Sequence, residues 1–321
     1  MSAGARWRPG SLPIASLGPF LALLLACVFF STQSSRFPSA QNFSLILQQV
    51  MVVGTIAIGQ TLIILTAGID LSCGAVMALG GVVMTKLAVM HGVNPYLAIS
   101  AGVLTCMGFG LVNGLLVTKI RLPPFIVTLG TMNIAFALTQ ITSEARTITD
   151  LPPAMTFLGN TWKLGGTAVN LGTLLMLALY LLVGFGLRDT APGRHVYAVG
   201  NNPEAARLTG IATHRVLASV YTLAGLLYGT AALLGVARTG VGDPQAGQTD
   251  ALDSITAVVL GGTSLFGGRG MLVGSLVGAL IVGVFRNGLT LMGVPSVYQI
   301  LVTGVLVILA VATDQMSRRK G

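Results

Sequence analysis

The stretch that decides the fold is FSLILQQVMVVGTIAIGQTLIILT, residues 43–66, which contains no charged side chain. A helix needs about 20 predominantly apolar residues to cross the hydrocarbon core of a bilayer. Similar apolar runs follow one another along the chain, near residues 12–30, 43–66, 74–90, 96–117, 125–142, 168–187, 216–237, 252–265, 271–290 and 297–312. They predict an all-α polytopic membrane protein with about ten transmembrane helices, in which residues 1–321 form a single transmembrane domain.

The composition agrees with this fold class. The 321 residues are 53% hydrophobic and 8% charged, whereas a soluble domain carries about a quarter charged residues. The 42 glycines suit tightly packed transmembrane helices, because small residues let backbones approach. The net charge of +9 is scattered over the loops, so no basic cluster indicates nucleic-acid binding.

Three of the runs, 74–90, 252–265 and 297–312, are short for a full crossing. We expect these helices to be broken, tilted or buried among neighbours, and hydropathy alone allows about eight to eleven spans. With the N-terminus inside, most of the 18 lysines and arginines fall on the inner side. The positive-inside rule therefore favours an even number of spans with both termini in the cytoplasm.

The N-terminal segment resembles a secretory signal, since Arg6 and Arg8 precede the first apolar run. That run is longer than a usual signal core, and no small-residue cleavage site follows it. We therefore predict a first span that stays in the protein.

Few residues could carry chemistry in the membrane. The charges within the predicted spans are Lys86, Asp253 and Arg286, each near an outer end where it can reach water. Ion-coupled carriers need a carboxylate along the path, so this pattern argues against one. The three cysteines and three histidines lack ligand spacing, and we expect no metal and no cofactor bound by this chain.

An internal echo is visible. LGG at 79–81 and NGL at 113–115 recur as LGG at 260–262 and NGL at 287–289. The echo predicts repeats of about 43–142 and 216–312 in opposite orientations, the architecture of alternating-access transporters. Such short strings are common in membrane proteins, so chance is the alternative.

Two segments interrupt the apolar pattern. In GIDLS, residues 68–72, Asp70 or Ser72 can cap a helix; the segment is either a capped turn at the membrane edge or a helix break beside a pathway. The glycine-rich stretch GGTSLFGGRG, residues 261–270, is not a nucleotide loop. No G-x-x-x-x-G-K-[ST] string occurs in the chain, so the chain does not hydrolyse ATP by that route.

The polar loop 188–215 is the largest break in the pattern. Pro203 and Glu204 suit a helix start, and Gly210 suits its end. We expect two to three turns of surface helix with Leu208 and Ile211 on one side. A helix this short is marginal alone, so it either docks in a partner's groove or packs on its own bundle.

At these three segments the chain resembles the permease subunits of bacterial ABC sugar importers of the ribose, xylose, arabinose and galactose group. The shared features are GIDLS at 68–72, a loop of the form G-R-x-x-Y-A-x-G-x-N-x-E-A-A-R-L-x-G-I at 193–211, and GGTSLFGGRG at 261–270, in family order. One departure is Cys73, where the family often has valine. The stretch LPPFIVTLG at 122–130 resembles fructose-type members, but the sugar stays open.

The resemblance implies partners and roles. A cytoplasmic ABC ATPase would grip the loop 188–215 and a periplasmic or extracellular binding protein would deliver a monosaccharide. A second permease copy or paralogue would complete a dimer in the bacterial inner membrane. The residues expected to contact the ATPase are Asn202, Glu204, Ala205, Ala206, Arg207, Leu208, Gly210 and Ile211; those expected to shape the pathway are Asp70, Ser72, Asn113, Asn287, Gly261 and Gly262.

Two alternatives stay open: an importer of the same fold for a polyol or a sugar-like signal, and an ion-coupled carrier. An intramembrane enzyme has no paired carboxylates and no Ser/His constellation to support it. The chain is therefore predicted to be a transport subunit.

Overall fold

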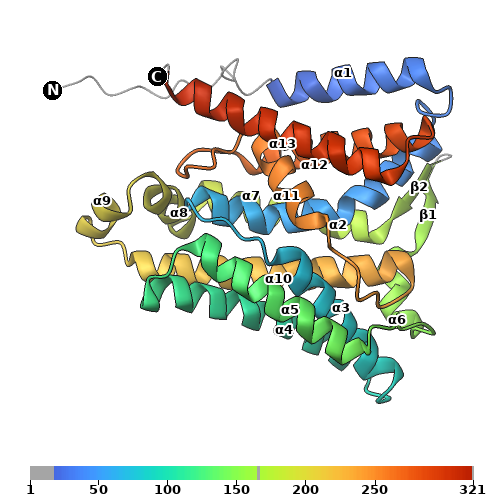
Figure 1. Cartoon of the computed structure of the whole chain (residues 1–321), viewed down its shortest axis with the longest axis horizontal. Coiled ribbons are helices and arrows are strands. Elements are labelled where there is room, and N and C mark those ends of the chain that lie inside the picture. The colour runs from blue at the N-terminus through green and yellow to red at the C-terminus, as the bar shows by residue number, and fades with distance from the viewer. Residues whose placement is uncertain (1–17, 165–166, 320–321) are drawn as a thin grey trace.

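The computed structural model describes residues 18–164 and 167–319 and is almost entirely helical (Figure 1). The helices are α1 (Gly18–Gln33), α2 (Ala40–Leu65), α3 (Cys73–Val89), α4 (Pro95–Leu115), α5 (Pro124–Ser143), α6 (Pro153–Thr156), α7 (Leu171–Asp189), α8 (Ala191–Asn201), α9 (Pro203–Leu208), α10 (Thr213–Thr239), α11 (Asp250–Leu260), α12 (Leu272–Leu291) and α13 (Ser296–Arg319). A π-helical turn, Leu116–Ile120, extends α4, and strands β1 (Thr161–Leu164) and β2 (Thr167–Asn170) pair antiparallel. Arg6, Arg8 and the start of the first predicted span lie outside the described residues.

Every predicted apolar run has its helix, in order along the chain. Within the described residues, six helices are long and apolar enough to cross a membrane: α2, α4 with its π turn, α5, α7, α10 and α12. Shorter apolar helices are α1, α3 and the first part of α13. The chain is therefore a multi-pass membrane protein.

The expectation of short helices is confirmed for α3, with 17 residues, and for α11, with 11. In α13 the apolar part, Ser296–Leu309, is also short, although the helix itself has 24 residues because its polar final turns continue past the apolar run. The predicted boundary at residue 265 is wrong. The helix α11 ends at Leu260, and Gly262 adopts a left-handed φ of 86°.

The centre of the bundle is formed by α2 and α10. From residue 50 to residue 65 every residue of α2 is buried, and α10 packs against both α2 and α4. The contact between α4 and α10 depends on glycine, because a Cβ atom at Gly110 would lie 2.3 Å from the carbonyl oxygen of Tyr221. Small residues at this interface let the two backbones approach.

Two helices, α3 and α11, begin inside the bundle rather than at one of its ends (Figure 1). Each follows a non-helical segment, residues 66–72 before α3 and residues 240–249 before α11. The two breaks touch, since a Cβ atom at Gly74 would lie 2.1 Å from the carbonyl oxygen of Gly247. Irregular backbone at membrane depth is tolerated only against protein or a water-filled cavity.

The connections separate into two groups at opposite ends of the molecule. Helices α8 and α9 project at one end, and α6 with the β1–β2 hairpin lies at the other (Figure 1). This arrangement agrees with the predicted alternation, in which residues 188–215 and residues 143–167 face opposite sides of the membrane.

Candidate functional site

The first helix break is a turn built around Asp70. One carboxylate oxygen, Oδ1, accepts a hydrogen bond from the backbone N–H of Ser72 at 2.7 Å and another from its hydroxyl at 2.6 Å. Asp70 is only 1% exposed. A turn closed by Asp70 is therefore present, but the predicted helix cap is wrong, because Ser72 is the N-cap of α3 and makes no side-chain cap hydrogen bond. The turn lies buried in the bundle and not at an exposed membrane edge.

Side chains from three helices surround this turn. From α4, the amide of Asn113 donates to the Ser72 hydroxyl at 3.1 Å. From α5, the hydroxyl of Thr128 donates to the carbonyl oxygen of Ile69 at 3.1 Å. From α2, the amide of Gln60 donates to the Asp70 carbonyl oxygen and to the sulfur of Cys73. The structure thus brings Asp70, Ser72 and Asn113 together, as expected of residues that act as a unit.

Sequence reasoning missed Gln60, although a signal was present. Gln60 is a fully buried amide in an otherwise apolar run, and such a group needs a partner. Here it holds the broken backbone before α3. Its partner, the carbonyl oxygen of Asp70, lies ten residues further along the chain and cannot be identified from the apolar run itself.

An ion pair lies beside the second helix break. The guanidinium of Arg286 on α12 lies 3.2 Å from the carboxylate of Asp253 on α11 and donates to the hydroxyl of Thr249 at 3.0 Å. Asp253 is 2% exposed. The prediction that Asp253 reaches water is wrong, because the arginine of the neighbouring helix provides its counter-charge. Lys86 donates to the carbonyl oxygen of Thr142 at 2.6 Å.

The remaining pathway candidates lie elsewhere. Asn287 accepts a hydrogen bond from Asn42 at 2.9 Å, near the start of α2, and so does not join the cluster at Asp70. Gly261 packs at the end of α11 against the backbone of α12, where its Cβ would lie 2.3 Å from the Gly274 carbonyl oxygen. Gly262 forms the following turn with its positive φ.

Helix α9 stands at the tip of the polar loop. The side chain of Asn202 caps it, with Oδ1 accepting from the backbone N–H groups of Glu204 at 3.1 Å and Ala205 at 2.9 Å. Glu204 and Arg207 form an exposed ion pair at 2.6 Å. The hydrogen bond and charge of Arg207 hold the pKa of the Glu204 carboxyl below its ordinary value. Among the residues of this helix only Ala206 is buried.

Two details of the predicted helix are wrong. It has six residues, which is less than two turns, because Thr209 caps it and Gly210 takes a left-handed φ of 88°. Leu208 is 77% exposed, whereas Ile211 is half-buried, so the two do not share a side. Leu208 is the large apolar side chain that α9 displays to solvent.

Helix α8 was not predicted, and it connects α9 to the bundle. The carbonyl oxygen of Leu65, at the end of α2, accepts from the Gly268 N–H at 2.9 Å. A Cβ atom at Gly200 of α8 would lie within 2.7 Å of that Gly268 nitrogen. The hydroxyl of Tyr197 on α8 donates to the Gly270 carbonyl oxygen at 3.1 Å. The polar loop, the end of α2 and the glycine-rich stretch therefore form one contact region.

This region leads directly to the Asp70 turn, because only residues 66–69 separate the end of α2 from it. The contact region of α8 and the break before α3 are therefore neighbours along the chain. The arrangement suits mechanical coupling and not bond-making chemistry. Among the described residues no group of three or more His, Cys, Asp or Glu side chains could hold a metal ion.

The family model and the similar proteins are all described as permeases. Residues 42–311 match a family model described as "Branched-chain amino acid transport system / permease component". The chain is 44% identical to the fructose import permease protein FrcC of Rhizobium meliloti, over 94% of this chain and 85% of that protein. It is 40% identical to the ribose import permease protein RbsC of Bacillus subtilis (strain 168), over 93% and 92%.

A third relative is named for a different sugar, L-arabinose. The chain is 34% identical to the L-arabinose ABC transporter permease protein AraH of Azospirillum brasilense, over 99% of this chain and 93% of that protein. No solved structure matches the chain.

Proposed function

The chain belongs to the family of permease components of transport systems of the branched-chain amino acid type, and we propose that it forms the membrane pathway for a monosaccharide. Its relatives are named for fructose, ribose and arabinose, and it covers most of the length of each. The protein is a multi-pass transport subunit of the bacterial membrane, and the energy for import comes from a separate ATPase. A binding protein delivers the sugar from the outer side.

The observation that carries this proposal is the construction of α8 and α9. The exposed surface of α9 presents the Glu204–Arg207 pair and the uncovered side chain of Leu208. Behind it, α8 packs on the end of α2 and on the glycine-rich stretch. A short exposed helix that α8 connects to a buried helix break is suited to transmit a conformational change of a soluble ATPase to that break. The ATPase therefore docks on α9, with Asn202, Ala205, Gly210 and Ile211 shaping the helix and its exit.

An inverted repeat gives the pathway its architecture. If α2–α5 are exchanged with α10–α13, the main helix contacts are preserved. The contacts α3–α4 and α3–α5 correspond to α11–α12 and α11–α13, while α4–α10 and α3–α10 correspond to α12–α2 and α11–α2. This correspondence supports repeats of about 43–142 and 216–312, and the proposal includes ten spans and two cytoplasmic termini. The pathway then runs beside the broken helices, which Asp70, Ser72, Asn113 and Gly261 hold in place.

Two copies of the chain, or this chain and a paralogue, enclose the pathway. The sugar arrives at the end of the bundle that carries the β1–β2 hairpin and leaves at the end that carries α9. No cofactor is needed by this chain, because the chemistry of ATP hydrolysis belongs to the partner. A polyol or a sugar-like signal is the alternative substrate within the same architecture.

Docking is tested by co-purification with candidate ATPase subunits. In the variant Glu204→Lys/Gly210→Asp, we expect normal membrane insertion and loss of the ATPase. The matched control is Glu144→Lys/Gly92→Asp at the other end of the molecule, where Gly92 also has a positive φ and open space around it. ATPase retention by the first variant, or equal loss from the control, would contradict docking on α9.

Transport is tested in proteoliposomes with the ATPase and a binding protein. We expect uptake of D-fructose or D-ribose that needs ATP and is insensitive to ionophores. Uptake driven by an ion gradient without ATP would favour a carrier instead. Uptake of mannitol but of neither sugar would favour the polyol alternative.

A further inference from the structure

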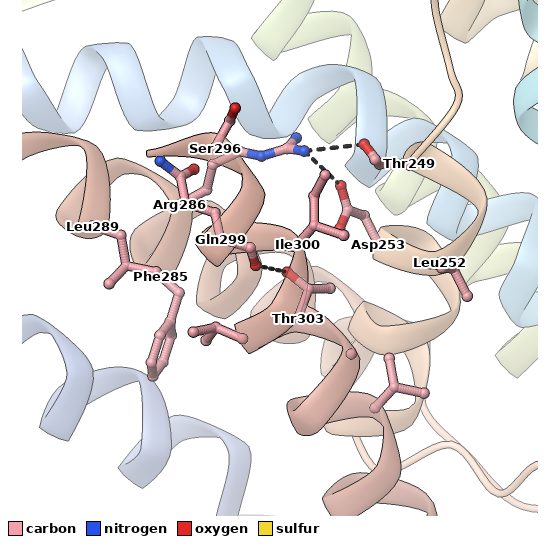
Figure 2. Close-up of a pocket in the computed structure, with 13 residues that line it drawn as sticks. Thr249, Leu252, Asp253, Phe285, Arg286, Leu289, Ser296, Gln299, Ile300 and Thr303 are labelled. Atoms are coloured by element: carbon pink, nitrogen blue, oxygen red, sulfur yellow. Dashed lines mark hydrogen bonds and ion pairs between the residues drawn. The ribbon is translucent and has the colours of Figure 1, made fainter. Parts of the chain in front are cut away.

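A cavity of about 480 Å³ lies between α11, α12 and α13 (Figure 2). Small-molecule sites typically occupy about 300–1,000 Å³, so the cavity is large enough for one monosaccharide. Its polar lining includes Thr249, Asp253 and Arg286, and the ring of Phe285 contributes to its apolar lining. Figure 2 shows the ion pair on one side of the cavity and Phe285 on another.

The ion pair keeps unused hydrogen-bonding capacity. In the described part of the chain, Arg286 contacts both Thr249 and Asp253 through the same nitrogen, Nη2. A guanidinium has five N–H donors, so those on Nε and Nη1 stay available. The buried Oδ2 atom of Asp253 lies 3.2 Å from Arg286 but forms no hydrogen bond with a described residue. Because Oδ2 is buried, the acceptors that a ligand meets include the hydroxyl oxygens of Thr249 and Ser296, which line the cavity together with the donors of Arg286.

Such a pair is expensive as a purely structural element. Its desolvation cost in a buried setting often exceeds the attraction between the charges. Within a membrane protein, paired ionisable groups that face a cavity are candidates for a substrate site. The Arg286 side chain is 41% exposed while that of Asp253 is 3% exposed, so the arginine reaches the cavity and the carboxylate forms its polar floor.

The chemistry of the lining selects the class of ligand. The pair is neutral as a whole, so a free anion meets Asp253 and a free cation meets Arg286. A neutral polyhydroxyl compound suits this lining, because each hydroxyl can accept from a guanidinium N–H and donate to the hydroxyl oxygen of Thr249 or Ser296. The apolar face of a sugar ring can also pack on Phe285, in keeping with pockets that combine apolar walls with few polar groups.

We propose that this cavity is a low-affinity monosaccharide site in the outer half of the transport pathway. The proposal rests on the function proposed above, since the outer side is assigned from it. Arg286 lies toward the end of α12 and Ser296 starts α13, which places the cavity on the side where a binding protein releases its sugar. Broken helices at a repeat interface commonly form such sites in transporters. Weak binding suits a site that must also release the sugar onward.

Direct occupancy is tested by protection of an introduced cysteine. Thr303 lines the cavity, and Thr303→Cys is to be labelled with a small methanethiosulfonate reagent. For a Kd of about 1 mM, about 10 mM D-fructose or D-ribose slows labelling about tenfold, because the unoccupied fraction falls as 1/(1 + [L]/Kd). The control Ser100→Cys on the exposed part of α4 labels at an unchanged rate, and gluconate, an anion, protects neither. Equal labelling of Thr303→Cys with and without either sugar would overturn the proposal.

The contribution of the ion pair is tested in the same assay with Asp253→Asn/Arg286→Gln. This variant leaves no unpaired buried charge, so it should fold as the parent does, which size-exclusion chromatography checks. We expect the Kd for sugar to rise at least about tenfold, the usual effect of losing hydrogen bonds to charged groups, so that about 10 mM sugar slows labelling only about twofold or less. Undiminished protection would show that the pair is structural and would overturn its assignment to the ligand.

The assay needs neither the ATPase nor the binding protein. Protection without ATP-driven uptake would keep the sugar site and refute the importer. Uptake without protection would keep the importer and refute the site. The two hypotheses therefore fail separately.

Discussion

Two helices of this bundle begin inside it, and their starts are stabilised in different ways. At α3, the carboxylate of Asp70 is closed off by Ser72, and the turn is held by neutral side chains from α2, α4 and α5. At α11, the carboxylate of Asp253 faces Arg286 from α12, beside an open cavity. Both helices start inside the bundle, but the start of α3 is enclosed by neutral side chains, whereas the start of α11 lies beside a cavity. We call them the locked break and the accessible break.

The difference suggests a division of labour between the two breaks. The first break adjoins the end of α2, where α8 and the glycine-rich stretch meet, so it is suited to transmit movement. The second break is suited to contact a ligand. If this division holds, substitutions at the two breaks and on α9 should differ in their effects on stability.

The largest effect is expected where the two breaks touch. In Gly74→Ala, the new Cβ would lie 2.1 Å from the Gly247 carbonyl oxygen, so the backbones must separate. Overpacking of this kind costs about 3 kcal/mol or more, and we expect loss of monodisperse protein in size-exclusion chromatography. The matched control is Gly108→Ala on α4, where nothing lies within 4 Å of the new atom. Similar behaviour of the two variants would mean that the breaks are not in obligatory contact.

The second prediction concerns the accessible break. Arg286→Gln leaves Asp253 buried without its counter-charge, which we expect to cost about 2–3 kcal/mol, below the value for fully buried pairs because Arg286 is partly exposed. Asp253→Asn/Arg286→Gln should recover most of that loss. Thermal unfolding in detergent measures both, with the exposed Arg146→Gln as the control. A double variant less stable than the single one would contradict this account.

The third prediction concerns the locked break. Asp70→Ala removes the acceptor of both hydrogen bonds from Ser72 and leaves their donors unsatisfied, at a cost of about 1–2 kcal/mol. Thermal unfolding is again the measurement, and the exposed Asp189→Ala is the control. Sugar protection at Thr303→Cys should stay unchanged in Asp70→Ala. A loss of protection without a loss of stability would reverse the division of labour between the two breaks.

These pairs also show what could be predicted from the sequence. The membrane helices follow from uncharged apolar runs, and the turn at Asp70 follows from a capping residue two positions before its donor. Helix α8 was missed because Pro192 and Gly193 are typical of a turn, whereas Pro192 starts the helix and Gly193 packs closely on the backbone at the end of α7. The pairing of Asp253 with Arg286 could not be predicted, because nothing local connects residues on separate helices.

The smallest effect on stability is expected at Glu204. Its carboxyl is exposed and paired with Arg207, and the pKa of Glu204 lies below its ordinary value because of that partner. A lowered pKa in the folded state means that the pair stabilises above the unfolded pKa and that this contribution disappears as the pH falls through the folded pKa. Exposed pairs contribute little, so Glu204→Gln should leave the unfolding temperature unchanged at neutral pH.

The same substitution should nevertheless weaken retention of the ATPase, because Glu204 orients Arg207 on the exposed face of α9. The control is Glu144→Gln, in the connection from α5 to α6; α6 lies at the end of the bundle opposite to α9 (Figure 1). A clear drop in unfolding temperature without any change in ATPase retention would assign Glu204 to the fold of the loop and not to docking. If ATPase retention changes while the unfolding temperature does not, Glu204 belongs to the docking surface and does not contribute to the stability of the two buried breaks.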